Sequence, residues 1–146
     1  MINDNFVVTG TPTITLYSET GAIKQQFSIP NLVVQAGKNW LASRAKDATS
    51  AVMSHMAIGS GNVAPVTGNT ALGTQLGIVA LTSTTVSTNT VTYLATFPAG
   101  TGTGAITEAG IFNAASAGTM LARTTFNVVN KDTTDTLTIS WAVTIN

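Results

Sequence analysis

The residue best suited to nucleophilic or acid–base chemistry is His55, the only histidine in the chain. A Ser–His–acid system would have to be built on it, because there is no cysteine to supply a thiol nucleophile. Ser54 is its neighbour, and adjacent side chains of an extended strand point to opposite faces. No Gly-x-Ser-x-Gly motif presents another serine. We therefore interpret His55 as a structural or interface residue.

Metal and cofactor sites are equally weakly supported. Thiolate ligands are absent, and the carboxylates are scattered singly along the chain, so we expect neither a metal nor a cofactor. Gly59-Ser60-Gly61 follows a predicted strand, as phosphate-binding loops do, but it lacks the third glycine and the lysine of such motifs. The sequence predicts a turn there.

Glu108 and Arg123 stand out because each lies in an otherwise apolar predicted strand. Two opposite charges in neighbouring strands can pair across a sheet. The pattern predicts a structural ion pair that fixes strand register, or a charged contact with another subunit. A catalytic role for Glu108 as a general base lacks a partner group.

The elements that would position these residues are mostly strands. Residues 1–10 are predicted to be an N-terminal arm and residues 11–146 a single domain. One amphipathic helix is predicted over residues 32–46, weakened by Gly37. Turn signals at short intervals favour an all-β, jelly-roll-like β-sandwich of about eight strands with one short helix. The strands are expected at residues 11–17, 22–29, 51–58, 77–87, 90–97, 105–112, 119–129 and 136–145.

Composition restricts the classes of function. Charged residues make up 8% of the chain, and the net charge is zero, whereas soluble domains carry roughly 25% charged residues. A neutral surface rich in hydroxyl groups suits extensive contact with other subunits, although a monomeric domain with a threonine-rich face has the same composition. Six cations spread over the chain do not form a nucleic-acid site. No apolar run suits a membrane span and no signal peptide is visible, so synthesis in a cytoplasm is expected.

Several segments resemble small structural proteins of tailed bacteriophages. The resemblance covers the chain from about Thr11 to its C-terminus and is moderately specific for virion proteins. Similar segments occur in capsid decoration proteins and in tail-fibre or baseplate components. The segments are Pro30–Arg44, His55–Gly61, Ala64–Pro65, Thr70–Leu72, Ile106–Asn113 and Gly118–Arg123.

The resemblance implies a non-enzymatic virion subunit present in many copies. A single domain without a repetitive shaft favours a capsid cement or decoration protein, which binds the major capsid protein and stabilises the assembled head. A symmetric homo-oligomer, such as a trimer, would gain from multivalent contact. The alternative is a tail-fibre or baseplate module bound to tail proteins, with Trp40, Trp141, Tyr17 and Tyr93 available to stack host glycans. A cell-wall hydrolase is a third hypothesis and would need His55 or Glu108.

Overall fold

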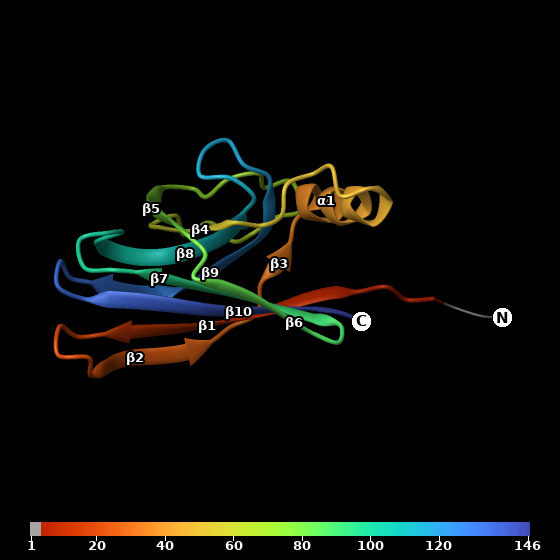
Figure 1. The fold of residues 1–146 in the computed structure, drawn as a ribbon. Coiled ribbons are helices and arrows are strands. Elements are labelled where there is room, and N and C mark those ends of the chain that lie inside the picture. Colours follow the sequence, from red (N-terminus) through yellow and green to blue (C-terminus); the bar gives the residue numbers. More distant parts are fainter. Residues whose placement is uncertain (1–3) are drawn as a thin grey trace.

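The structure is a computed structural model that describes residues 4–146, and this part of the chain forms ten strands and one helix (Figure 1). The strands make two antiparallel five-stranded sheets that pack face to face. The first sheet consists, in order, of β2 (Ile23–Ser28), β1 (Val8–Tyr17), β10 (Thr136–Ile145), β7 (Thr90–Phe97) and β6 (Ser83–Ser87). The second consists of β3 (Leu32–Val33), β9 (Met120–Lys131), β8 (Gly104–Phe112), β4 (His55–Gly59) and β5 (Gln75–Ala80). The predicted all-β sandwich with one short helix is confirmed.

The first sheet follows from strict alternation of apolar and polar residues. In its central strand β10, Leu137, Ile139 and Trp141 are fully buried, whereas the intervening side chains are half-buried. Because side chains of a strand alternate with a period of two residues, these buried apolar side chains of β10 all face the other sheet. β10 pairs with β1 on one side and β7 on the other, so the main hydrophobic core lies between the two sheets.

The second sheet is covered on both faces. Ala109 and Ile111 of β8 contribute to the core between the sheets, while Phe112 and Met120 belong to a smaller apolar cluster. Leu72, in the loop between β4 and β5, packs against this smaller cluster. The outer face is thus covered by that loop and by the start of the helix.

The helix α1 (Gln35–Lys46) begins three residues later than predicted. Leu32 and Val33 form β3 instead, where they pair with Arg123 and Ala122 of β9. Gly37 is the one fully buried residue of the helix, and a Cβ atom there would lie 2.1 Å from the carbonyl oxygen of Leu121. The glycine that weakens the helix is therefore what allows it to approach β9.

Two further differences from the predicted elements have simple causes. The expected strand at residues 77–87 is divided into β5 and β6, which lie in different sheets, because the chain crosses between the sheets at residues 81–82. With β3, this gives ten strands rather than about eight. Val8 to Gly10, assigned to the predicted arm, pair with β10; the first three residues of that arm lie outside the described residues.

No helix in residues 4–146 is long and apolar enough to cross a membrane.

Candidate functional site: a buried carboxylate clamp

Glu108 lies near the middle of β8 on the outer face of the second sheet. The register between β8 and β9 shifts between Ile106 and Glu108, and Ala109, the next residue, points into the core between the sheets. Because successive side chains alternate, Glu108 points to the opposite side, beneath the loop of residues 60–74. The glutamate is fully buried there.

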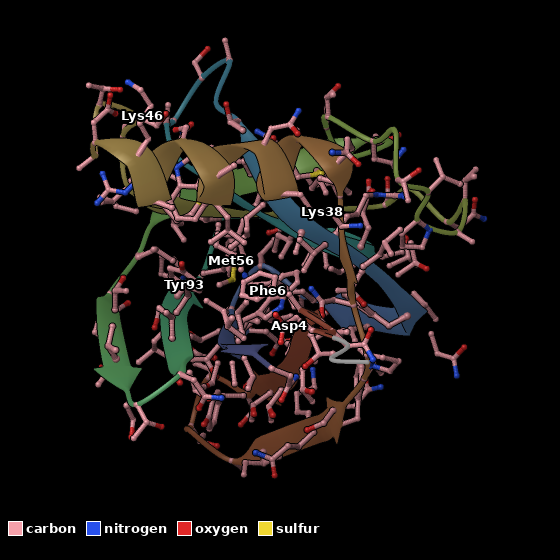
Figure 2. The ribbon with its side chains drawn as sticks, turned by 90° about the vertical axis from the view of Figure 1, so that its right-hand side faces the viewer. Asp4, Phe6, Lys38, Lys46, Met56 and Tyr93 are labelled. Atoms are coloured by element: carbon pink, nitrogen blue, oxygen red, sulfur yellow. The ribbon has the colours of Figure 1, made fainter. Side chains whose placement is uncertain are left out.

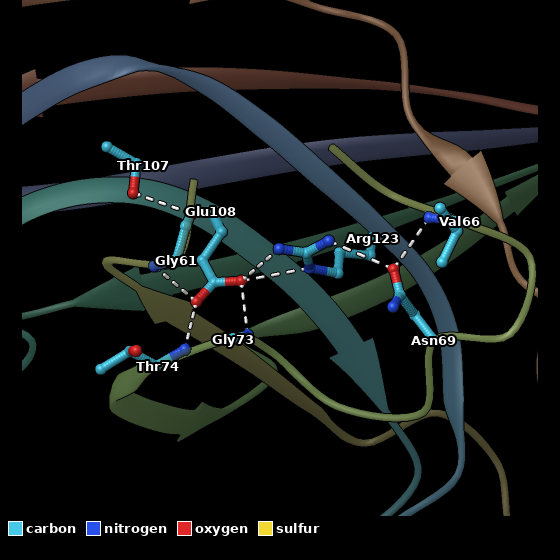
Figure 3. A network of polar contacts seen from close by, with 8 residues as sticks. All are labelled: Gly61, Val66, Asn69, Gly73, Thr74, Thr107, Glu108 and Arg123. Atoms are coloured by element: carbon cyan, nitrogen blue, oxygen red, sulfur yellow. Dashed lines mark hydrogen bonds and ion pairs between the residues drawn. The ribbon is translucent and has the colours of Figure 1, made fainter. Parts of the chain in front are cut away.

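Arg123 reaches Glu108 from the neighbouring strand β9. Its Nε and Nη2 atoms both donate to Oε2 of Glu108, at 3.1 and 2.9 Å (Figure 3). The arginine is itself only 2% exposed. The structure thus brings together the two charges that the sequence suggested as a pair, in a site closed to water.

Three backbone N–H groups complete the surroundings of the carboxylate. Gly61 and Thr74 donate to Oε1 and Gly73 donates to Oε2, each at 2.8 Å. These three donors come from the two ends of the loop between β4 and β5, as Figure 3 shows. One side chain of β8 therefore fastens both ends of this loop to the sheet.

We call Glu108, Arg123 and the three backbone N–H groups the clamp. Further polar contacts connect it to the middle of the loop. Nη1 of Arg123 donates to Oδ1 of Asn69 at 3.1 Å, and the same oxygen accepts the N–H of Val66 at 2.9 Å. Thr107 Oγ1 donates to the carbonyl oxygen of Gly61 at 2.9 Å. The loop is consequently held at its ends and near its middle.

The pKa of Glu108 reflects these contacts. Burial alone would raise the pKa of its carboxyl group, since a charge is costly to remove from water. The hydrogen bonds from Thr74, Gly73, Arg123 and Gly61 favour the ionised form and outweigh burial, so the pKa of Glu108 lies below its usual value. The side chain is an ionised acceptor at neutral pH.

This arrangement is suited to holding structure rather than to proton transfer. Both oxygens of Glu108 already accept hydrogen bonds from the protein, and no part of the side chain reaches solvent. Gly61 is required by the close approach, because a Cβ atom there would lie 2.5 Å from Oε1 of Glu108. The glycine-containing turn after β4 thus binds an anion, as phosphate loops do, but the anion is a side chain of the same protein.

His55 differs from its predicted environment. Its Nδ1 atom lies 2.8 Å from Oγ of Ser54, so the two side chains do meet. The expectation of opposite faces was wrong, because β4 begins at His55 and Ser54 precedes the regular strand. Among residues 4–146, no carboxylate is hydrogen-bonded to His55, and no group of three His, Asp or Glu side chains is arranged to hold a metal ion.

The aromatic side chains considered for sugar stacking are largely covered. Trp141 is fully buried and Tyr93 is 5% exposed, while Trp40 and Tyr17 are half-buried. Nε1 of Trp40 donates to the carbonyl oxygen of Ala51. Trp141 and Tyr93 are therefore too deeply buried to stack a sugar, and none of the four is fully exposed.

The clamped loop, in contrast, presents apolar side chains to solvent. Val63 is 74% exposed and Val66 is 57% exposed. Residues 60–74 contain no helix or strand. Loops longer than about 12–15 residues without secondary structure are usually functional or disordered, and this one is fastened internally. Sequence reasoning missed the loop as a site; Glu108 in an apolar strand was its one visible signal.

The chain is similar to one known family of proteins over most of its length. The family described as phage tail-collar fibre protein, N-terminal, matches residues 24–144. This range includes Glu108, Arg123 and the entire clamped loop. No curated protein and no solved structure matches the chain significantly.

Proposed function

The chain belongs to the phage tail-collar fibre protein N-terminal family, and we propose that it is a tail-fibre or baseplate module whose clamped loop contacts neighbouring tail proteins. Membership of this family makes the chain a structural component of the virion. The finer assignment to the tail agrees with the family description and with the alternative that the sequence left open. We expect no catalytic activity from it.

The observation that carries the proposal is the Glu108 clamp beneath an exposed apolar loop. Burying an ion pair has a large desolvation cost. An arrangement that accepts this cost to hold one loop in place indicates that the conformation of the loop matters for function. A loop fixed before binding loses little conformational entropy when a partner docks, which strengthens the contact. Val63 and Val66 would then supply apolar contact area on a prearranged surface.

The shortage of charge supports the same role. Glu108 and Asp135 are buried in ion pairs within the domain, which leaves few ionised groups at the surface. Contact with another subunit therefore requires little desolvation of charge, because hydroxyl groups and small apolar side chains predominate. Such a surface suits the permanent contacts of a virion.

Capsid cement, the first prediction from the sequence, now ranks second. The single domain and the multivalent contacts that favoured a cement protein are not specific to the head, because they suit a tail assembly equally well. Glycan binding by the fibre also ranks lower, because Trp141 and Tyr93 are buried and Trp40 and Tyr17 are half-buried.

The position in the particle tests the proposal. Purified phage should be labelled with a gold-tagged antibody against this chain and imaged by electron microscopy. Label at the tail or baseplate supports the proposal, whereas label distributed over the head surface would overturn it in favour of cement. A control antibody against the major capsid protein identifies the head pattern.

A further inference from the structure

An apolar groove opens between α1 and the adjoining ends of β1 and β10. It has a volume of about 920 Å³, and Val8, Leu41, Ala45 and Ile145 contribute apolar side chains to its walls. Figure 2 looks into this end of the molecule, with α1 above and the N-terminal segment crossing below it. The segment that leads into β1 and the C-terminal residue meet here, since Val7 and Asn146 exchange backbone hydrogen bonds.

The charged side chains of the groove are both cationic. Lys38 and Arg44 of α1 line it, and no carboxylate from residues 4–146 does. Lys38 has no ion pair within residues 4–146, and Arg44 donates only to the backbone carbonyls of Ala48 and Ser50. The third basic residue of the helix, Lys46, is paired with Asp47. The groove therefore suits an occupant that is apolar and carries a negative charge.

A segment of the same chain has this chemistry. Asp4 is exposed and forms no ion pair in the part of the chain that the structure describes. It is followed closely by Phe6, 71% exposed, and Val7, 50% exposed. Phe6 and Val7 also line the groove of their own copy, where each keeps half or more of its surface exposed, and Asp4 lies on the strand side, away from Lys38 on the helix (Figure 2).

We infer that the groove is an interface between copies of this chain, in which the Asp4–Val7 segment of one copy occupies the groove of the next. Phe6 and Val7 would be buried against Leu41 and Ala45, and Asp4 would meet Lys38. Each copy then supplies one segment and one groove, so a small closed ring satisfies every copy. The inference does not depend on tail location, because the partner is a second copy.

Charge exchange tests the interface. The full chain and its variants are compared by analytical ultracentrifugation over a range of concentrations. We expect the wild-type chain to self-associate. Asp4→Lys and Lys38→Glu should each raise the dissociation constant by about tenfold or more, because like charges then face each other. The double variant Asp4→Lys/Lys38→Glu should recover association, and Lys46→Glu, on the same helix, should leave it unchanged.

Loss of the aromatic side chain gives an independent measurement. Phe6→Ser should weaken association by about thirtyfold, as expected for an aromatic anchor, whereas Val128→Ser, at an exposed apolar position outside the groove and the clamped loop, should have no effect. A wild-type chain that stays monomeric, single charge reversals that change nothing, or a double variant that does not recover would overturn the inference.

Cross-linking shows whether the contact joins two copies. Because the chain has no cysteine, a Phe6→Cys chain and a separately tagged Ala45→Cys chain can be mixed and oxidised. A disulfide-linked heterodimer that forms in much higher yield than with a Val128→Cys control supports the inference. Equal yields with the two would contradict it.

Discussion

Glu108 and Arg123 meet diagonally across β8 and β9: the residue directly opposite Arg123 is Gly110, two positions along from the glutamate. The guanidinium binds one carboxylate oxygen, Oε2, through two N–H groups, while backbone N–H groups of the loop donate to both oxygens. A Cβ atom at Gly110 would lie 3.1 Å from a methyl group of Leu72, so this glycine leaves room for a side chain of the loop. The ion pair is thus inseparable from the loop that covers it.

A double-mutant cycle on this pair is the first prediction. Glu108→Gln replaces an acceptor with an amide that faces N–H donors, and Arg123→Met leaves a buried carboxylate without its cation. Each change should lower the free energy of unfolding by about 3–5 kcal/mol. The double variant should lose at least about 1 kcal/mol less than the sum, as measured by urea denaturation. Effects that add to within about 0.5 kcal/mol would argue against coupling.

Gly61→Ala should destabilise the domain through a clash with the carboxylate. The new Cβ atom would lie 2.5 Å from Oε1 of Glu108, so the clamp must move. We expect a loss of about 1–3 kcal/mol. Gly68→Ala is the matched control in the same loop, because nothing lies within 4 Å of its Cβ position. It should be neutral or stabilise by up to about 1 kcal/mol; equal losses at both positions would contradict the clamp.

Acid should weaken the fold through Glu108. The pKa of its carboxyl group is lower in the folded protein than its usual value of 4.5, so the folded state favours the ionised form. The resulting stability is complete above about pH 4.5 and is lost as the pH falls towards the folded-state pKa. Thermal unfolding between neutral and acidic pH should show a steeper decline for the wild type than for Glu108→Gln. Parallel pH profiles would exclude this linkage.

Lys131 is a buried charged residue whose removal we expect the fold to tolerate, in contrast to Glu108. It is 1% exposed, and burial lowers the pKa of its amine. Its Nζ atom donates to the carbonyl oxygen of Pro98, which also accepts the N–H of Thr101. Lys131→Met therefore leaves no acceptor unpaired, and the free energy of unfolding should stay constant or rise by about 1 kcal/mol. A loss above about 2 kcal/mol would show that the amine stabilises the domain.

The regular parts of the fold could be predicted because they have strong local patterns. β10 alternates over its full length, and the helix was visible from its apolar spacing. The crossing at residues 81–82 has no such signal, since the residues on either side of it, 78–80 and 83–86, are all β-branched or small and no glycine or proline separates them. The start of α1 was misjudged because Leu32 and Val33 pair with β9, a contact distant in the sequence.

The candidate site could be predicted only in part. Two lone charges in apolar strands pointed to Glu108 and Arg123, because a buried charge needs a partner. The three backbone donors could not be foreseen, since any residue except proline supplies an N–H group and only the folded loop brings these ones together. The contact of Ser54 with His55 depended likewise on where β4 begins.

The role of the clamped loop is tested most directly by incorporation into particles. Phage lacking this gene product would be complemented with Val63→Asp/Val66→Asp, and with Val86→Asp/Val128→Asp as the control at other exposed valines. The amount of the chain in purified particles would be measured after each variant is shown to unfold at the wild-type temperature. We predict that the loop variant is absent from particles and the control is incorporated normally. Normal incorporation of the loop variant would contradict the contact surface proposed here.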